Sequence, residues 1–94
     1  METRFKPKFW KDIQKVKNDK EVVIALSKIF LQVENSKDIN EINNIKKLIH
    51  YQSRFRIKLY FDKKRDYRIG LYIQGKTVWF ARFLTRRKIY DENW

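Results

Sequence analysis

The sequence predicts an α+β fold, in which an N-terminal helical hairpin packs on an antiparallel-dominated sheet of about four strands. Two observations predict this order: apolar residues recur at helical spacing in the first half of the chain, and the period changes to two from Arg54 onward. The third observation is composition, because 43% of the residues are hydrophobic and only two are Gly and one is Pro. We therefore expect regular elements around one core and a single domain over residues 1–94.

The helical hairpin is expected to begin at Pro7, because proline suits the first turn of a helix. Residues 2–6, just before it, are a candidate short strand that would precede the hairpin. Four apolar side chains then recur at helical spacing, and the lysines between them fall largely on the solvent side of the helix. These apolar residues are Phe9, Trp10, Ile13 and Val16.

The second helix is expected after Asn18 and Asp19, which suit a break followed by a new N-cap. A second apolar stripe follows, formed by Val22, Leu26, Ile29 and Val33. Turn-forming residues at 35–38 end this helix. Four further apolar residues then recur at a period of three, which predicts a short helix or a tight connecting segment. They are Ile39, Ile42, Ile45 and Leu48.

The second half of the chain is expected to form an antiparallel meander. Residues 54–60 alternate between apolar and mostly cationic side chains, which is typical of a half-buried strand. The charged residues 62–66 form a turn into a second strand. A tight turn at residues 74–76 follows, in which Gly75 is expected to adopt a positive φ. Residues 77–84 are nearly continuously apolar, as a central strand should be.

Positive charge gathers in this meander. Between Tyr51 and Tyr90 there are twelve Lys and Arg residues against two acids, Asp62 and Asp66, so the segment carries +10 of the chain's net charge of +12. A rigid sheet with Arg, Lys and Tyr side chains suits a polyanion and its phosphates. Nucleic acid is the expected partner, and RNA is the first candidate.

Several classes of site are disfavoured by the residues that the chain lacks. There is no Cys, so disulfides and thiolate metal sites are excluded, and a cytoplasmic location is expected. The one histidine, His50, has no clustered carboxylates as co-ligands. We therefore expect neither a metal site nor a cofactor. No apolar run approaches the length of a membrane span, and no signal-peptide pattern opens the chain.

The residues that remain suit chemistry on phosphate. RNA supplies its own nucleophile, the 2′-OH, so a ribonuclease must remove that proton, stabilise the charge on phosphorus and protonate the leaving 5′-oxygen. The arginine fork binds two phosphate oxygens and keeps its charge. A tyrosine can act as base where neighbouring cations lower its pKa below about 10. From the residues alone, RNA binding without cleavage is favoured over cleavage.

The meander and its tail resemble the C-terminal half of the RelE/ParE superfamily of toxins from type II toxin–antitoxin modules. The resemblance rests on Tyr67-Arg68-Ile69-Gly70 and on the segment from Val78 through Thr85-Arg86-Arg87-Lys88-Ile89-Tyr90. The opening residues 5–13 resemble the family's short strand leading into a helix, and Lys46-Lys47-Leu48 fits the family before the strands. The resemblance implies two helices against a four-stranded sheet. It also implies metal-independent cleavage of mRNA in the ribosomal A site through 2′-OH attack.

The family's functional positions map onto a small set of residues. The resemblance implies catalytic roles for Lys58, Arg68, Arg86 and Tyr90. Tyr90 or Lys58 would assist 2′-OH deprotonation, Arg68 would bind the scissile phosphate, and Arg86 would stabilise or protonate the leaving oxygen. Arg87 is one position from Arg86 and could take its place. The expected RNA-binding residues are Arg56, Arg87, Lys88 and Arg82.

The chain departs from the family pattern in several ways: Thr85 stands where relatives often have His, the turn at residues 62–66 is longer than usual, and Trp94 ends the chain close behind Tyr90, where many relatives continue. Two alternatives to RNA cleavage stay open. ParE-like members of the superfamily inhibit DNA gyrase, although they generally lack the Arg/Lys/Tyr set. The other alternative is a non-catalytic basic protein that binds nucleic acid or the ribosome, whose binding would fall smoothly as cations are removed.

The resemblance also implies partners. A cognate antitoxin is expected to neutralise the groove formed by Arg56, Lys58, Arg68 and Arg86, and mRNA, with the ribosome, is the expected target. The aromatic residues Trp79 and Trp94 are expected to be exposed contact points. Phe9, Trp10 and Ile13 are further candidates for this contact, although core packing is favoured for them.

Overall fold

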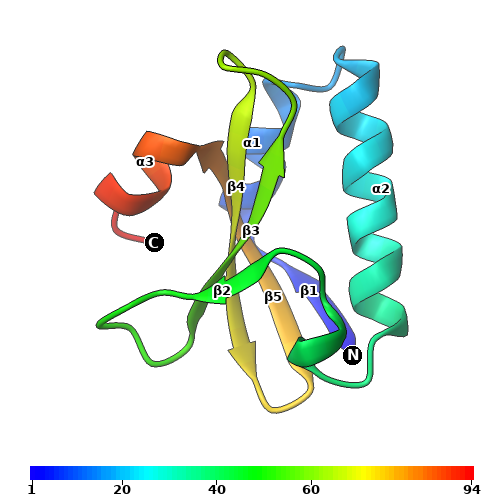
Figure 1. The fold of residues 1–94 in the computed structure, drawn as a ribbon, viewed down its shortest axis with the longest axis vertical. Coiled ribbons are helices and arrows are strands. Elements are labelled where there is room, and N and C mark those ends of the chain that lie inside the picture. The colour runs from blue at the N-terminus through cyan, green and yellow to red at the C-terminus, as the bar shows by residue number, and fades with distance from the viewer.

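The computed structural model describes all 94 residues, arranged as three α-helices, a short 3-10 helix and one five-stranded sheet (Figure 1). In chain order the elements are β1 (Glu2–Phe5), α1 (Pro7–Gln14), α2 (Lys20–Asn35), η1 (Ile39–Glu41), β2 (Ile45–Lys47), β3 (Arg54–Tyr60), β4 (Asp66–Gln74), β5 (Thr77–Thr85) and α3 (Arg86–Asp91). The predicted α+β class, the helical hairpin and the short first strand are confirmed.

The sheet has the order β1-β5-β4-β3-β2. Strands β2 to β5 pair antiparallel, whereas β1 runs parallel to β5 and forms the opposite edge. The strand count of about four was too low by one. The additional strand, β2, lies within residues 39–48, for which we expected a short helix or a connecting segment. The expected short helix forms as the 3-10 helix η1, and it is followed by the edge strand β2. The isoleucines at a period of three therefore belong to two different elements.

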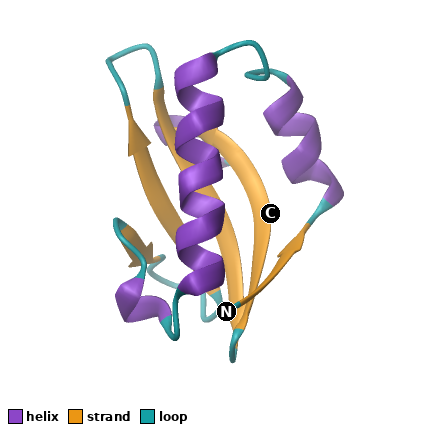
Figure 2. Ribbon diagram, turned by 90° about the vertical axis from the view of Figure 1, so that its right-hand side faces the viewer, coloured by secondary structure: helices purple, strands orange, loops and turns teal.

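The two faces of the sheet are covered unequally. Helices α1 and α2 lie on one face, which we call the core face, and α3 lies on the other, which we call the basic face (Figures 1 and 2). Twelve buried residues form the core between the sheet and helices α1 and α2. At one end the fully buried Phe80 ring packs against Phe5, Phe9 and Phe30, with ring centroids 5.1–5.5 Å apart.

The helix starts follow the predicted chemistry. Pro7 occupies the first turn of α1, and the Asp19 side chain accepts a hydrogen bond from the Val22 N–H at the start of α2. Phe9 is fully buried and Ile13 partly buried, in agreement with core packing, but Trp10 stays 46% exposed. No helix is both long and apolar enough to cross a membrane.

The long turn between β3 and β4 is fixed to the start of α2. The Arg65 guanidinium pairs with Asp62 at 2.9 Å and with Asp19 and Glu21 at 3.2 Å each. The hydrogen bonds from Arg65 hold the pKa of the Asp62 carboxyl below its usual value, and the same carboxylates raise the pKa of Arg65. The charged turn is therefore an ordered connection between the meander and the helical hairpin.

A β-bulge in β5 changes which side chains share a face. Gly70 of β4 pairs with Arg82, but the next residue, Leu71, pairs with Phe80, so Ala81 is the extra residue. Trp79 and Arg82 consequently lie on the same, basic, face, and Phe80 and Phe83 both reach the core face. Strict alternation would have separated each of these pairs. Trp79 and Trp94 are also only partly exposed, less than expected, and their contact with a partner stays a prediction.

Candidate nucleic-acid interface

The strand register arranges the basic face in rows that run across the sheet. Three rows contain direct partners on β3, β4 and β5, and a fourth has partners on β3 and β4 alone. The rows are Arg54–Tyr72–Trp79, then Arg56–Gly70–Arg82, then Lys58–Arg68–Leu84, and finally Tyr60–Asp66. Opposite partners in antiparallel strands have Cβ atoms about 5 Å apart, and diagonal neighbours are still within reach of long side chains. The meander thus brings Arg56, Lys58 and Arg68 together.

Arg68 is the most constrained of these cations. It lies on a central strand, its side chain is 7% exposed, and its Nη1 donates to Asp66 Oδ1 at 2.5 Å and to the Tyr67 carbonyl at 2.9 Å. Its Nε is buried and has no hydrogen-bond partner within the protein. The Arg68 guanidinium is thus hydrogen-bonded through Nη1, while its buried Nε is left without a partner, which is energetically costly.

Arg56 shows the same pattern on the neighbouring row. Its Nη1 donates to the Asn44 carbonyl at 2.9 Å, which fixes the guanidinium against the edge of the sheet. Its Nε is the other buried side-chain nitrogen without a partner. Arg56 and Arg68 are diagonal neighbours in the register of β3 and β4, and each has a guanidinium group that is incompletely hydrogen-bonded. The arginine guanidinium is a side chain that suits phosphate oxygens.

Four further predicted cations are exposed and take part in no ion pair: Lys58, Arg86, Arg87 and Lys88. Lys58 is exposed on β3 directly opposite Arg68. Arg86, Arg87 and Lys88 form the first turn of α3, where all three are exposed. This helix, which the sequence analysis missed, begins at Thr85, whose hydroxyl accepts from the Lys88 N–H at 3.4 Å. Thr85 therefore has a structural role as the N-cap of α3.

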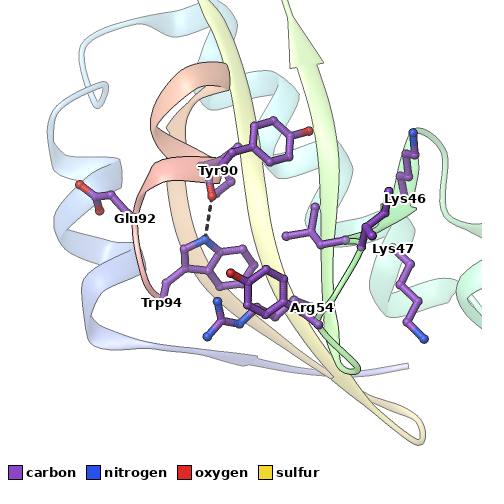
Figure 3. Close-up of a pocket in the computed structure, with 10 residues that line it drawn as sticks. Lys46, Lys47, Arg54, Tyr90, Glu92 and Trp94 are labelled. Atoms are coloured by element: carbon purple, nitrogen blue, oxygen red, sulfur yellow. Dashed lines mark hydrogen bonds between the residues drawn. The ribbon is translucent and has the colours of Figure 1, made fainter.

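Tyr90 projects from α3 into a groove on the basic face (Figure 3). The groove has a volume of about 240 Å³ and lies between α3 and the β2–β3 segment. Figure 3 shows the Tyr90 ring extending from α3 over the sheet toward the side on which Lys46 lies, whereas Glu92 points to the other side. The phenol is 55% exposed. It is therefore available to a molecule bound along the sheet.

The position of α3 depends on a close contact at Gly70. A Cβ atom on this residue would lie 2.8 Å from Cζ2 of Trp94 and 3.1 Å from Cδ1 of Ile89. The Trp94 indole also donates its N–H to the Ile89 carbonyl at 3.0 Å (Figure 3). The absence of a side chain at Gly70 lets the buried Ile89 and the Trp94 ring seal the middle of the basic face. Tyr90 is thus carried by a docked helix.

Arg82 is placed differently from the other predicted RNA-binding residues. Its Nε donates to Asp12 Oδ2 at 2.8 Å, its Nη2 to Asp12 Oδ1 at 3.2 Å and its Nη1 to Glu92 at 2.7 Å. Asp12 is 5% exposed and also accepts from the Phe83 N–H at 2.9 Å. The Asp12 carboxylate raises the pKa of Arg82. Arg82 therefore joins α1 and the C-terminal segment to β5, and its donors are occupied.

Sequence reasoning missed two residues that line the groove around Tyr90. They are Tyr51 and Arg54, which lie there with Lys46, Lys47 and Trp94. Arg54 alternates with Arg56 and Lys58 along β3, and this period-two pattern was the signal that could have placed it on the basic face. No group of three or more His, Asp or Glu side chains lies close enough together to hold a metal ion.

The chain is similar to one curated toxin over nearly its full length. It is 34% identical over 92 residues to Toxin RelE3 of Methanocaldococcus jannaschii, and the match covers 97% of both chains. No protein-family model matches the chain.

Two solved structures have the same overall fold. One is the RelB–RelE antitoxin–toxin complex from Methanococcus jannaschii, which matches with a TM-score of 0.75 and 31% identity over 94% of this chain and 95% of that chain. The other is YafQ from E. coli strain BL21(DE3), with a TM-score of 0.61 and 13% identity over 95% of this chain and 97% of that one. The second likeness is one of fold alone.

Proposed function

Because this chain belongs to the RelE family of toxins, we propose that it is the toxin of a type II toxin–antitoxin module and that it acts as an endoribonuclease on mRNA, with the ribosome as the setting. The observation that carries the proposal is the group of Arg56, Lys58 and Arg68 on adjacent rows of the basic face. Two of these three cations retain buried, unpaired guanidinium nitrogens. A phosphodiester is the anion that this arrangement suits best.

The proposed reaction needs no group beyond RNA and these side chains. The 2′-O–H loses its proton to Tyr90, acting as a phenolate, or to Lys58, acting as a neutral amine, and the 2′-oxygen attacks the adjacent phosphorus. Arg68, supported by Arg56, binds the phosphate oxygens while their negative charge increases. The P–O5′ bond breaks, and Arg86 stabilises the leaving 5′-oxygen, which takes up a proton equivalent to the one that the base accepted, so that the base is regenerated. The products are a 2′,3′-cyclic phosphate and a free 5′-OH.

The proposal assigns an antitoxin as protein partner, since a similar chain is found in a RelB–RelE antitoxin–toxin complex. An antitoxin that inhibits cleavage would cover the basic face, where Lys58 and the first turn of α3 are free of internal ion pairs. Arg87 and Lys88 are proposed to contact the RNA backbone. Arg82 is proposed to stabilise the fold, because Asp12 and Glu92 occupy its donors.

The test is primer extension on a translated reporter mRNA after regulated expression of the wild-type chain, Lys58→Gln and Tyr90→Phe. Lys63→Gln is the matched control, because Lys63 is an exposed lysine in the β3–β4 turn, outside the group. We expect discrete cuts with wild type and Lys63→Gln and a loss of cutting by about 100-fold or more in the other two variants. Growth arrest with intact mRNA would contradict the proposal and indicate another target, such as gyrase.

A further inference from the structure

The groove beside Tyr90 contains a cluster of aromatic rings around one guanidinium group. The Arg54 Cζ atom lies 4.4 Å from the centroid of the Tyr51 ring, 5.1 Å from that of Trp94 and 5.6 Å from that of Tyr72. Each distance is within the range of a cation–π contact. Arg54 makes no ion pair, and its one side-chain hydrogen bond is a long one, 3.4 Å, to Asn93. Its charge is thus held among aromatic faces.

Tyr51 is the outermost ring of this cluster. It belongs to the segment between β2 and β3 and is 48% exposed, whereas Tyr72 and Trp94 are only partly exposed. Tyr72 and Trp94 also contact each other at 5.3 Å between centroids. Because Trp94 is held against Gly70, the cluster has a fixed base and an accessible outer ring. This is the arrangement of a platform that can accept a further flat, polarisable group.

The charge around the groove selects the kind of flat group. Lys46, Lys47 and Arg54 line it, and its one acid, Glu92, is neutralised by Arg82 at 2.7 Å. Aromatic faces within a cationic groove favour the bases of single-stranded nucleic acid, which stack on rings while the backbone follows the cations. Tyr90 lines the same groove, so a base bound there would lie next to the proposed cleavage site.

We propose that Tyr51, supported by Arg54 and Trp94, is a stacking subsite for one base of single-stranded RNA adjacent to the scissile phosphate. This inference rests on the proposed function and names how that same site holds its substrate. Stacking is tolerant of base identity, because every base has a π-face. The subsite therefore positions the strand, and the cations of the basic face hold the phosphates.

The experiment measures the affinity of the Tyr90→Phe protein, which is expected not to cut, for a short fluorescein-labelled single-stranded RNA by fluorescence anisotropy. In this background we compare Tyr51→Ala with Tyr51→Phe, which keeps the ring, and with Gln52→Ala, which alters the neighbouring exposed residue of the same segment. We expect Tyr51→Ala to weaken binding by roughly 5- to 100-fold. Tyr51→Phe and Gln52→Ala should bind within about twofold of the parent.

Salt dependence separates stacking from a loss of charge. Tyr51→Ala should leave the slope of log affinity against log salt concentration unchanged, whereas Lys58→Gln should reduce it by about 0.7, the value for one phosphate contact on a single strand. A set of RNAs with one abasic position each then locates the base. The abasic RNA that loses most affinity with the parent should lose none further with Tyr51→Ala.

Three results would overturn the subsite: equal affinities of Tyr51→Ala and the parent, equal losses in Tyr51→Ala and Tyr51→Phe, or no binding of the RNA by the parent. None of these results depends on cleavage. The primer-extension test judges the proposed function separately, so a failure of one proposal can be told from a failure of the other.

Discussion

The two faces of the sheet are made by the same three strands but are built from opposite kinds of residue. On the core face, β3, β4 and β5 contribute Ile57, Ile69 and Phe80, each at most 1% exposed. On the basic face the same strands present cations and aromatic rings, and only the short helix α3 covers them. Period-two alternation therefore lets one meander serve stability on one side and ligand binding on the other. Mutations on the two faces should have separable effects.

The largest expected difference is between Phe80→Ala and Lys58→Ala. Phe80 is fully buried among three other phenylalanine rings, so its truncation should cost about 3–5 kcal/mol of unfolding free energy. Lys58 is exposed, so its truncation should cost less than about 0.5 kcal/mol while removing cleavage. Urea unfolding of both variants measures the difference. A stability loss in Lys58→Ala as large as that in Phe80→Ala would show that the faces are not independent.

The next prediction concerns the ion pair that crosses from α1 to the basic face. Asp12→Ala should cost about 3 kcal/mol or more, because it leaves the mostly buried Arg82 and the Phe83 N–H without their acceptor. Glu92→Gln is the matched control, because Glu92 is the other carboxylate that pairs with the Arg82 guanidinium. Glu92 is 42% exposed on its side chain, so its loss should cost less than about 1 kcal/mol. Thermal unfolding would contradict this reading if the two variants had equal midpoints.

A smaller effect is expected at the N-cap of α3. Thr85→Ala removes the acceptor for the Lys88 N–H and should destabilise the docked helix by about 1 kcal/mol. Thr85→Ser, which keeps the hydroxyl, should recover most of the loss. Hydrogen exchange of the α3 amides is the measurement. Unchanged protection in Thr85→Ala would mean that Trp94 and Ile89 alone hold the helix.

The smallest effect is a pH dependence on the core face. Tyr67 packs between Phe61 and Phe83, and burial raises its pKa above the usual value of 10. The unfolded chain therefore releases this proton at lower pH than the folded one, so stability should fall as the pH rises above about 10. Tyr67→Phe should lessen that fall and leave stability near pH 7 within about 0.5 kcal/mol. Urea unfolding at pH 8 and pH 11 tests it, and identical alkaline losses in both proteins would contradict it.

The long elements were predictable because their periods are strong local signals. The stripe from Val22 to Val33 identified α2, Asp19 identified its cap, and the alternation after Arg54 identified β3. Gly75 has the expected positive φ of 59°. Two short elements were not predicted: β2 has three residues, and α3 has only Ile89 as a buried side chain. Neither is long enough to display a period.

The candidate site was predictable in part. Lys58 and Arg68 are direct partners on β3 and β4, the two strands that the charged turn was predicted to connect. The role of Arg82, in contrast, depends on its hydrogen bonds to Asp12, which is seventy residues away along the chain. The bulge at Ala81 leaves no mark in the apolar run of β5. Trp94 packs on Gly70 because glycine has no Cβ atom, and the sequence alone does not show which residue packs against this glycine. Local sequence patterns do not show contacts between residues that are far apart along the chain.

The most direct test of the central claim, that the basic face cuts RNA by attack of its own 2′-OH, uses an mRNA with a single 2′-deoxy nucleotide at a mapped cut site. The account predicts that translated, unmodified mRNA is cut there to a 2′,3′-cyclic phosphate and a 5′-OH. The same message carrying the 2′-deoxy nucleotide should stay intact at that site while other sites are still cut. Cleavage that persists at the 2′-deoxy position would contradict the mechanism, whatever the effect of mutating Lys58 or Tyr90.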